Sequence, residues 1–577
     1  MALRPPGGPV GHPPRGPRGG VSMSTDPHST MGCTIDDSVE TAADVVVFGS
    51  GAAGLAAAVT AAAAGCTVQL FEKAAAVGGT TAKSGGVYWV PDNHLMRERG
   101  IDDPQARAVA YMARVSAPDR YSSEEPLLGL TAWEHDLLTG YYGLASEAVQ
   151  FLDDIGALRS TIEMALRFPD YHMNLPEQGG VYGRALCPAD EQNRPGNGGD
   201  LIAQLTAAAT RSGVAITTRH AFTDLVVEDG RVAGAVVRDL ENGPQFRVRA
   251  RLGVVLAVGG FTHHPEHRSR HLPARVWGGC AAGGNTGDAL HPLAALDIPL
   301  HNMDCAWWDQ VAIEHTLAGT TETRAGMWVA PGDSSLIVDL AGRRIVNEKL
   351  FYSDRAKVHI GPGSPELLVL LFDERTQQLF SMEQFAYPLA LPGESTTHLV
   401  SGESWEQLSA NLDVRLRSLR AATGGARLSG DFGSNLAATI ARFNMSASAG
   451  VDAEHGRGTE PIEVFFTGEP RAGGGPNPVM APLSADGPFH AVLVGLGTLD
   501  TKGGPRTTVD GRVLGVGGVP VDGLYAAGNC AASPSNDGYW AAGATIGPAL
   551  AFGYGAGRHL AARRATDNNV PAQGVTS

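Results

Sequence analysis

The chain has 577 residues, of which 43% are hydrophobic and 18% charged, and its formal net charge is -16. A globular chain of this length holds more than one domain, because a single core stops growing at roughly 250–300 residues. The negative charge argues against a nucleic-acid partner, since a polyanion would be repelled. The six cysteines form no CxxC pair, so no metal site is expected, and reduced thiols favour a cytoplasmic location.

The two ends of the chain differ in composition from its middle. Residues 1–42 are rich in proline and glycine and are expected to be a disordered leader, in which Met23 and Met31 leave the true start open. No apolar core of a signal peptide follows its arginines, and no stretch of the chain reaches the roughly 20 apolar residues that span a membrane. Residues 566–577 are expected to be a flexible tail.

A nucleotide-binding pattern begins directly after the leader. Residues 44–48 are a short β-branched run typical of a buried parallel strand, and GxGxxG follows at residues 49–54. An alanine-rich helix to residue 64 and a second strand at residues 67–71 come next, and that strand ends at Glu72. The spacing predicts a βαβ unit that binds a dinucleotide, with Glu72 accepting hydrogen bonds from the adenosine ribose.

The three glycines of this pattern have separate tasks. Gly49 turns the chain, Gly51 lets a pyrophosphate approach the backbone, and Gly54 lets the helix pack closely on the strand. The first turn of the helix, with Ala52 and Ala53, offers unpaired N–H groups to the phosphates. A tight βα turn without a ligand is the alternative for an isolated GxGxxG.

The segment after Glu72 favours FAD over NAD. Residues 78–81 (GGTT) and 84–86 (SGG) form a glycine-rich stretch that can wrap the ribityl–pyrophosphate of a flavin, whereas a nicotinamide domain would continue into its next βα unit. A glycine-rich surface loop is the alternative for this stretch.

Further motifs follow along the chain, and with the glycine pattern the matching part of the sequence runs from about Asp44 to His559. They are residues 254–261 (VVLAVGGF), 285–288 (NTGD), 342–348 (GRRIVNE), 441–444 (ARFN), 487–489 (GPF), 499–504 (LDTKGG), 523–529 (GLYAAGN) and 545–548 (TIGP). In this order the chain resembles the flavoprotein family of fumarate reductase and succinate dehydrogenase flavin subunits, and within it the 3-ketosteroid Δ1-dehydrogenase (3-oxosteroid 1-dehydrogenase) branch.

This resemblance implies the architecture and the cofactor. We expect an α/β protein in which a Rossmann-like FAD-binding domain, residues 43–295 and 484–565, is interrupted by an inserted α+β substrate domain, residues 296–483. Quinone-linked members bind flavin covalently through a His beside the glycine loop, and residues 79–82 contain none, so the FAD should be non-covalent. The residues assigned to the cofactor are Gly49, Gly51, Ala52, Ala53, Gly54, Glu72, Lys73, Gly79, Thr80, Thr81, Ser84, Gly85, Gly86, Gly259, Asn285, Asp288, Gly528, Asn529, Thr545 and Ile546.

Two positions distinguish the branches of the family. Fumarate reductases resemble this chain around Asn347-Glu348, but have an Arg four residues after that Glu, where this chain has Tyr352. They have a second Arg near the C-terminus, which clamps the substrate carboxylate, and Trp540 stands there in this chain. A buried dicarboxylate needs such cations, so fumarate chemistry is disfavoured, although Arg355 lies near the first position.

The ketosteroid branch has a Tyr at the first position and Tyr-x-x-x-Gly at the second, matching Tyr352, Tyr539 and Gly543. The resemblance implies that the Tyr539 hydroxyl and the Gly543 N–H polarise the substrate carbonyl, and that Tyr352 removes the α proton while a hydride leaves the β carbon for flavin N5. A second Tyr would lower the pKa of Tyr352 or relay its proton. Tyr171 matches it best, with Tyr182 as the alternative. A core aromatic residue is the other interpretation of each tyrosine.

The expected partners are a small apolar ketone and a quinone or other electron acceptor. Trp307, Trp308, Met303, Met327, Trp328 and Phe351 are either the walls of a flat apolar pocket or ordinary core. Steroid Δ1-dehydrogenases have Tyr-Pro-Gly-Pro-Gly where this chain has Tyr539-Trp-Ala-Ala-Gly543, so the substrate could be a terpenoid or other cyclic enone. Two further hypotheses stay open: a soluble fumarate- or urocanate-type α,β-reductase, and a flavin-binding protein without catalysis.

Overall fold

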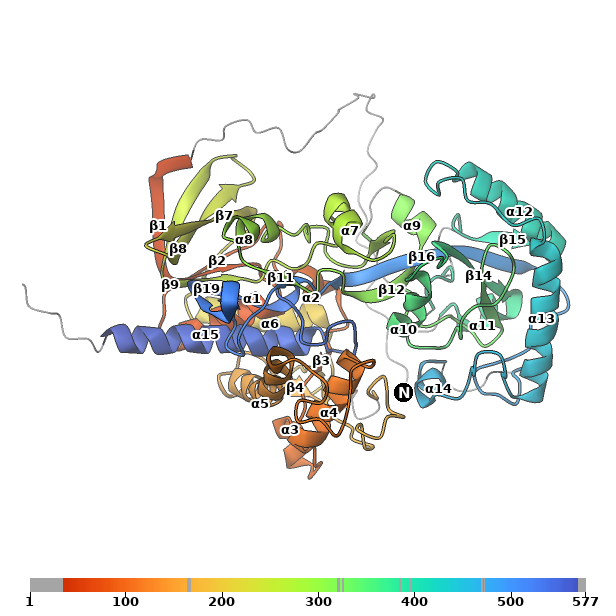
Figure 1. Ribbon diagram of the computed structural model, residues 1–577, viewed down its shortest axis with the longest axis horizontal. Helices are drawn as coiled ribbons and strands as arrows, with labels where there is room; N and C mark the ends of the chain where they lie inside the picture. Colours follow the sequence, from red (N-terminus) through yellow and green to blue (C-terminus); the bar gives the residue numbers. More distant parts are fainter. Residues whose placement is uncertain are drawn as a thin grey trace, which may run out of the picture.

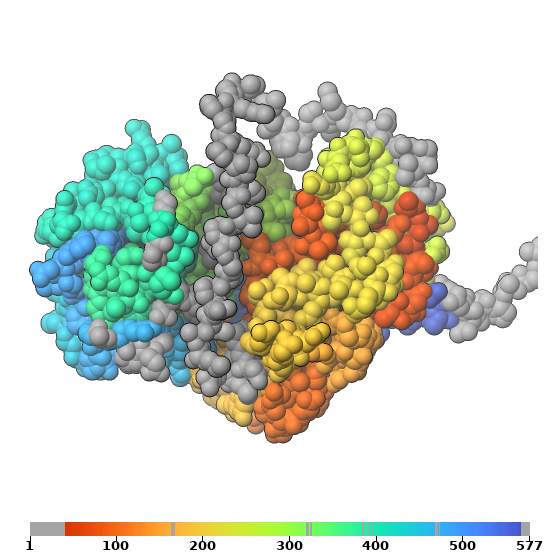
Figure 2. All heavy atoms as spheres, turned by 180° about the vertical axis from the view of Figure 1, so that it is seen from behind, coloured from red at the N-terminus to blue at the C-terminus, as the bar shows by residue number. Residues whose placement is uncertain are grey.

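The structure, a computed structural model, describes residues 35–162, 168–318, 322–323, 326–382, 386–391, 393–394, 396–467, 471 and 473–568. Two large sheets lie side by side, and the long strand β16 belongs to the second of them (Figure 1). Seen from behind, the cyan atoms around α12 and α13 occupy one side of the molecule and the orange and yellow atoms of the N-terminal part occupy the other (Figure 2). None of the helices in the described part is long and apolar enough to cross a membrane.

The first sheet is Rossmann-like and is built from both ends of the chain. Its neighbouring strands β6, β2, β1, β9 and β19 are parallel, while β18 is antiparallel to β19 and the β7–β8 hairpin joins β9. Their bounds are β1 Ile35–Phe48, β2 Val68–Phe71, β6 Ala215–Thr217, β7 His220–Glu228, β8 Arg231–Asp239, β9 Gln245–Leu256, β18 Arg512–Leu514 and β19 Pro520–Ala526.

Helices cover this sheet, and the closest of them is α1 (Ala52–Ala63), whose residues 52–62 are all buried. Its alanines allow α15 (Ile546–Asn568) to run directly alongside it (Figure 1). A helix that is apolar on every side has to be buried in this way. The other helices on this side of the molecule are α2 Gly79–Lys83, α3 His94–Glu98, α4 Gln105–Ser116, α5 Ala132–Asp154, α6 Gly198–Arg211, α7 Pro265–His271 and α8 Leu290–Ala295.

The second sheet is centred on β16 (Phe489–Thr501). Buried leucines at i, i+4 and i+8 of α12, which are Leu408, Leu412 and Leu416, belong to the core cluster on one of its faces. Its other strands are β10 Gly278–Gly279, β12 Ala306–Ala312, β13 Ser335–Val338, β14 Leu367–Asp373 and β15 Val400–Gly402. The helices of this part are α9 Ile313–Leu317, α10 Tyr352–Ala356, α11 Glu374–Phe380, α12 Trp405–Ser418, α13 Phe432–Ala449 and α14 Pro461–Thr467.

Short elements complete the fold. Strand β11 pairs with β17, and β5 pairs with both β3 and β4. The bounds are β3 Tyr88–Trp89, β4 Ser160–Thr161, β5 Ala185–Pro188, β11 Leu300–His301, β17 Gly504–Pro505, and the 3-10 helices η2 Lys357–His359, η3 Val516–Gly518 and η4 Gly528–Cys530.

Three boundaries differ from those predicted. Residues 35–42, expected in the disordered leader, are the start of β1, because they pair with β9. Helix α15 continues to Asn568, three residues beyond the predicted end of the FAD domain. Strand β16 lies within the segment predicted for that domain, yet its partners are strands of the second sheet, a pairing that local sequence does not reveal. Residues 1–34 and 569–577 lie outside the described residues.

Candidate active site

The turn from β1 into α1 is shaped by glycine. Gly49 has a φ of +95°, and a Cβ there would overlap the carbonyl oxygen of Ala257 at the end of β9. Gly54 lies one turn into the helix, where a Cβ would overlap the carbonyl oxygen of Gly49. A larger residue at either position would therefore push the helix away from the strands. The N-terminus of α1 is left at the mouth of a cavity.

This cavity, of about 370 Å³, is lined by residues from many separate segments of the chain, between Phe48 and Ala549. Gly54 packs behind the turn, and Gly86 lies against the backbone of Asn197 and Gly198, so neither lines it. The other residues assigned to the cofactor all line it: Gly49, Gly51, Ala52, Ala53, Glu72, Lys73, Gly79, Thr80, Thr81, Ser84, Gly85, Gly259, Asn285, Asp288, Gly528, Asn529, Thr545 and Ile546.

Glu72 is fixed at the end of β2 by the loops around it. One of its carboxylate oxygens accepts hydrogen bonds from the N–H and the hydroxyl of Ser50, at 3.0 and 2.5 Å, and the other accepts one from the N–H of Ala74, at 2.7 Å. The Ser50 hydroxyl also accepts a bond from the N–H of Gly78, at 2.8 Å. Ser50 therefore links the first glycine loop to the second, and it is one of the cavity residues that sequence reasoning missed.

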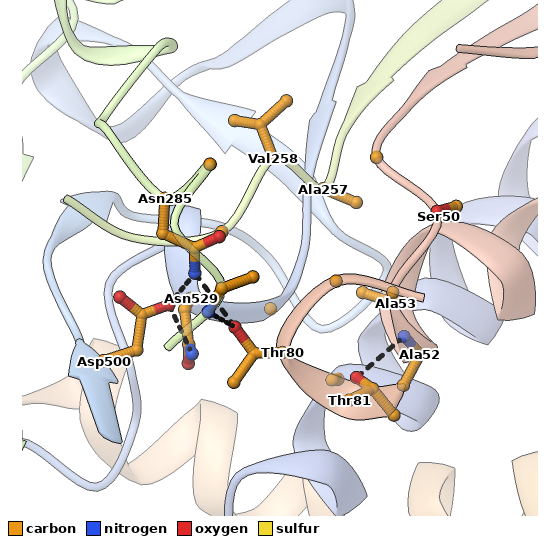
Figure 3. Close-up of a pocket in the computed structure, with 18 of the residues that line it drawn as sticks. Ser50, Ala52, Ala53, Thr80, Thr81, Ala257, Val258, Asn285, Asp500 and Asn529 are labelled. Atoms are coloured by element: carbon orange, nitrogen blue, oxygen red, sulfur yellow. Dashed lines mark hydrogen bonds between the residues drawn. The ribbon is translucent and has the colours of Figure 1, made fainter. Parts of the chain in front are cut away.

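A buried polar network closes the opposite side of the cavity (Figure 3). Asp500, at the end of β16, accepts hydrogen bonds from the side-chain amides of Asn285 and Asn529, at 2.5 and 3.0 Å, and from the N–H of Gly260, at 3.0 Å. Asn285 also donates to the Thr80 hydroxyl, at 3.2 Å. Because each contact joins a different segment, the network fixes the glycine loop, β9 and β16 relative to one another.

Two further features set the charge of the cavity wall. The Lys73 ammonium pairs with Asp288 at 2.8 Å. Helix α15 begins at the cavity, where Thr545 and Ile546 lie in its wall, so the positive end of its dipole faces the space.

Near α1, the Ala52 N–H donates to the Thr81 hydroxyl, at 3.2 Å (Figure 3).

Sequence reasoning missed several residues that line the cavity. Four aromatic rings gather on the side of Glu72, and they come from β1, β2 and the β7–β8 hairpin: Phe48, Phe71, His220 and Phe222. Ala257, Val258, Leu499 and Asp500 lie within quoted motifs, which was the available signal, but they had not been assigned to the site. Cys280 follows β10 of the second sheet, and no local pattern marks it, whereas Trp307 and Trp328 belong to the predicted candidate wall residues and do line the cavity.

The residues present fit FAD. The glycine turn leaves a helix N-terminus open to phosphate, and Glu72 stands at the end of β2, where a ribose would lie. The cavity continues from this end to the N-terminus of a second long helix, α15, which suits the electron-rich end of a flavin. A cofactor with phosphates in its middle and an extended ring at one end matches a cavity whose wall includes both Glu72 and the start of α15.

Three tyrosines from distant segments meet behind the cavity wall. The hydroxyl oxygens of Tyr171 and Tyr352 are 3.0 Å apart, and the ring centroids of Tyr352 and Tyr539 are 5.5 Å apart. All three side chains are buried, at 4%, 1% and 4% exposure. Trp328 packs on Tyr352 and Trp307 packs on Tyr539, at ring distances of 4.6 and 4.7 Å, and both tryptophans line the cavity.

The surroundings of these hydroxyls oppose ionisation. Burial raises the pKa of Tyr352 well above its ordinary value of 10.0, and the neighbouring Tyr171 and Tyr539 raise it further. Burial likewise raises the pKa of Tyr171 and that of Tyr539. The expectation that a second tyrosine lowers the pKa of Tyr352 is therefore wrong, because that tyrosine is itself a buried neutral phenol. The other expected role of a second tyrosine, relay of the proton, stays a prediction, for which the Tyr171 and Tyr352 hydroxyls lie within hydrogen-bonding distance.

The neighbours of Tyr539 are arranged by the turn that follows it. Gly543 has a φ of +85°, and a Cβ there would lie 2.6 Å from the Cα of Tyr88. Trp540 points away from the tyrosines into the core, where its ring packs on Trp89 and Tyr141, at 5.5 and 5.6 Å. The bulk of Trp540 therefore does not obstruct the space beside the Tyr539 hydroxyl.

The structure also shows which of the predicted pocket-wall residues lie near the tyrosines and which lie in the core. Trp307, Trp328 and Phe351 contact the three tyrosines. Trp308 and Met327 are buried in the cores of the second part, and Met303 packs against the same core as Trp308. Tyr182, the alternative to Tyr171, is 50% exposed.

Arg355 is buried near Tyr352, but each of its nitrogens already has an acceptor. Nε donates to Gln310 at 2.7 Å, one terminal nitrogen donates to the carbonyl of Leu350 at 3.0 Å, and the other donates to the carbonyl of Met327. This guanidinium is part of the packing between α10 and β12. It does not present a bidentate clamp for a carboxylate.

Comparison with known proteins agrees with this geometry. The family described as "FAD binding domain" matches residues 44–546. The chain belongs to this family. It is 32% identical to the 3-oxosteroid 1-dehydrogenase of Mycobacterium tuberculosis, over 90% of this chain and 98% of that protein. It is 31% identical to the 4-oxocyclohexanecarboxylate 2-dehydrogenase of Sinomonas cyclohexanicum, over 90% of this chain and 93% of that protein.

A solved structure shares the fold of this FAD-binding protein. The crystal structure of 3-ketosteroid delta1-dehydrogenase from Sterolibacterium denitrificans, in complex with 1,4-androstadiene-3,17-dione, has a TM-score of 0.75 at 24% identity, covering 91% of this chain and 100% of that one. The predicted α/β flavoprotein fold, the family and the cofactor are thus confirmed, and the chain is an FAD-dependent oxidoreductase. Across the described ranges, no group of three or more His, Cys, Asp or Glu side chains could hold a metal ion.

Proposed function

We propose that this oxidoreductase desaturates a cyclic ketone of the 3-ketosteroid type, at the carbons α and β to the carbonyl group. The observation that supports it most directly is the cluster of Tyr171, Tyr352 and Tyr539 behind tryptophans that line the FAD cavity. The names of the two relatives support the same chemistry, because each is a dehydrogenase of a ring ketone.

The carbonyl group of the substrate has to be polarised before its α proton can be removed. In the proposed mechanism the Tyr539 hydroxyl and the Gly543 N–H donate hydrogen bonds to the carbonyl oxygen, where negative charge develops. Gly543 carries out this task through its backbone, and its carbonyl is held by the N–H of Trp89 at 3.0 Å. Because the cluster is buried, these donors would act in a medium of low dielectric, where they stabilise charge more strongly than in water.

Tyr352 is the proposed acceptor of the α proton, and Tyr171 is its proton-relay partner. A single oxygen–oxygen contact of 3.0 Å joins them, so the proton of Tyr352 can leave through the Tyr171 hydroxyl to water, and the Tyr352 phenolate then accepts the α proton. When bound, FAD supplies the acceptor for the hydride that leaves the β carbon. Trp307 and Trp328 exclude water between the tyrosines and the cavity.

The cofactor is proposed to lie along the lined cavity without a covalent bond. The turn at Gly49 and the N-terminus of α1 would hold the pyrophosphate, and Glu72 the ribose. Asn285 and Asn529, which Asp500 orients, would contact the flavin part, and Thr545 would stand at the positive end of α15.

A dicarboxylate substrate fits the site less well than an apolar ketone. Trp540 occupies the position of the second arginine and is directed into the core, and the guanidinium nitrogens of Arg355 are engaged by Gln310 and main-chain carbonyls. A buried carboxylate without a cation is very costly. A fumarate- or urocanate-type reductase is therefore disfavoured, and a non-catalytic flavin protein would have no use for three buried phenols beside its cofactor.

The reduced flavin needs a partner in the cell. A quinone or another electron acceptor must reoxidise the flavin after each turnover. A cytoplasmic location is supported by Cys66, Cys280, Cys305 and Cys530, which are free thiols in the described part of the chain.

Anaerobic titration of the yellow protein tests the proposed reaction. Each candidate is added without an electron acceptor while the oxidised flavin band is followed: a 3-ketosteroid, a single-ring cyclohexanone carboxylate, a terpenoid enone and succinate. We expect the 3-ketosteroid to bleach the flavin. Bleaching by succinate alone, with reoxidation of the reduced protein by fumarate, would favour the reductase instead, as would oxidation of reduced viologen by fumarate. Failure of every ketone would favour the non-catalytic hypothesis.

A further inference from the structure

Lys502 is a buried cation at the junction of the two sheets, directly after β16. It is 1% exposed. Its ammonium donates to the Ser535 hydroxyl at 3.2 Å, to the carbonyl of Asn536 at 2.9 Å and to the carbonyl of Gly538 at 2.5 Å. Within the described chain no carboxylate lies within 4.0 Å of it, so all three N–H groups are used to hold one loop, residues 533–538.

Burial of this ammonium costs free energy, which indicates that the fold requires its three N–H donors at this place. Burial lowers the pKa of Lys502 to about 7, and the carboxylate of Asp537 opposes that change. An apolar side chain would fill the same space without this cost, but it would leave the carbonyls of Asn536 and Gly538 without their donor. The main chain is tied to the same loop, because the Ser533 N–H donates to the Lys502 carbonyl at 3.0 Å.

The same ammonium contacts the ring that supports Tyr539. Its nitrogen lies 3.7 Å from the centroid of the Trp307 ring, which is within the range of a strong cation–π contact. The Trp307 ring lies 4.7 Å from that of Tyr539, and its N–H donates to Asn529 at 3.0 Å. Lys502 therefore reaches Tyr539 by two routes: through the Trp307 ring, and through Gly538, whose carbonyl belongs to the peptide that precedes Tyr539.

We propose that Lys502 is a positioning residue for Tyr539: it fixes the 533–538 loop and the Trp307 indole, and together these direct the Tyr539 hydroxyl at the substrate carbonyl. This inference rests on the proposed function, in which Tyr539 polarises that oxygen. It assigns no contact between Lys502 and the substrate. A small displacement of Tyr539 weakens a hydrogen bond that is strongest in the transition state. Loss of Lys502 should therefore lower kcat and leave KM nearly unchanged.

The test is a double-mutant cycle of Lys502→Met with Tyr539→Phe, measured by steady-state kinetics on the ketone that bleaches the flavin. Lys502→Met alone is expected to lower kcat about 100-fold, as loss of a carbonyl-polarising donor does, with KM changed less than about threefold. In the Tyr539→Phe background the same substitution should change kcat by less than about twofold, because the group it positions is absent. An equal fall in both backgrounds, or an unchanged kcat for Lys502→Met, would overturn the inference.

A second measurement does not depend on activity. Hydrogen exchange of the peptide covering residues 533–543 should become faster in Lys502→Met, while FAD stays bound. Lys349→Met is the matched control, because Lys349 is also fully buried and donates to the carbonyls of Ala330 and Gly332, so exchange of residues 533–543 should not change. If no ketone reacts with the wild-type protein, the proposed reaction fails; unchanged exchange in Lys502→Met would then reject the positioning role separately.

A milder variant covers the case in which Lys502→Met does not fold. Ser535→Ala removes one of the three acceptors and leaves the ammonium in place. It should lower kcat about threefold to tenfold, and again only when Tyr539 is present. Equal losses with Tyr539 and with Phe at that position would contradict the proposal.

Discussion

The hydroxyl oxygens of Tyr171 and Tyr352 lie 3.0 Å apart in a buried cluster, although the two residues are 181 positions apart in the chain. The N–H of Tyr171 is bound by the carbonyl of Trp540 at 3.1 Å, and Asp170 before it is held by Arg184 at 2.6 Å. The position of Tyr171 is therefore fixed by its own main chain and by a buried ion pair. This contact is the basis of the proposed proton relay.

The relay makes a prediction for Tyr171. Tyr171→Phe should lower the rate of flavin reduction by the ketone about 10- to 100-fold, because the proton on Tyr352 loses its exit, while FAD binding is kept. Tyr182→Phe is the control, since Tyr182 is 50% exposed and the same single oxygen is removed. Rapid-mixing absorbance under anaerobic conditions measures both variants. Equal rates in the two would remove Tyr171 from the relay.

The raised pKa values predict the pH dependence. Burial raises the pKa of Tyr352 well above 10.0, so the phenol is neutral at pH 7, and the form that accepts a proton becomes more abundant as the pH rises. The rate of flavin reduction should therefore increase with pH, by up to about tenfold per unit, without levelling off below pH 9. A plateau reached near pH 7 would mean that a group with a much lower pKa is the base.

Because the turn at Gly543 is tightly packed, a methyl group added at this position should lower both stability and activity. Gly543→Ala places a Cβ 2.6 Å from the backbone of Tyr88 at a φ of +85°, so unfolding free energy should fall by about 1–3 kcal/mol and activity should fall with it. Gly363→Ala is the matched control, because Gly363 also has a positive φ, of +78°, but has nothing within 4 Å of the added atom. The control should cost about 1 kcal/mol and keep full activity. Thermal unfolding and steady-state rates compare the two.

The glycine loop predicts how the flavin is attached. Residues 79–82 offer no His, so acid precipitation of the protein should release all of the FAD into the supernatant as a yellow solution. Absorbance of the pellet and of the supernatant decides the matter. Flavin that stays with the precipitate would show a covalent bond, with His220 and Cys280 as the first residues to substitute, because both line the cavity.

The sequence alone was sufficient to predict features whose residues are close together in the chain. The strand, the GxGxxG turn and Glu72 follow one another within 29 residues, and each is dictated by backbone geometry that only those residue types allow. The family resemblance located Tyr352 and Tyr539 by their motifs. Those assignments needed no knowledge of which strands are neighbours.

The sequence was insufficient to predict which residues reach the site when this depends on the pairing of strands or on the direction of a side chain. Asp500 and Trp307 reach the site because β12 and β16 are neighbouring strands, and no local pattern specifies that pairing. Trp540 follows Tyr539 directly in the chain, yet its side chain points away from the three tyrosines and packs on Trp89, a direction that the sequence does not reveal. The pKa of Tyr352 depends on burial, which a motif does not report.

The most direct test of the account is a single turnover with Tyr352→Phe. The variant, loaded with FAD, is mixed anaerobically with the 3-ketosteroid, and the oxidised flavin band is followed beside that of the wild-type protein. We expect that the wild type bleaches and that the variant binds the steroid but reduces its flavin about 1,000-fold more slowly. Reduction at the wild-type rate in the variant would contradict the assignment of Tyr352 as the base.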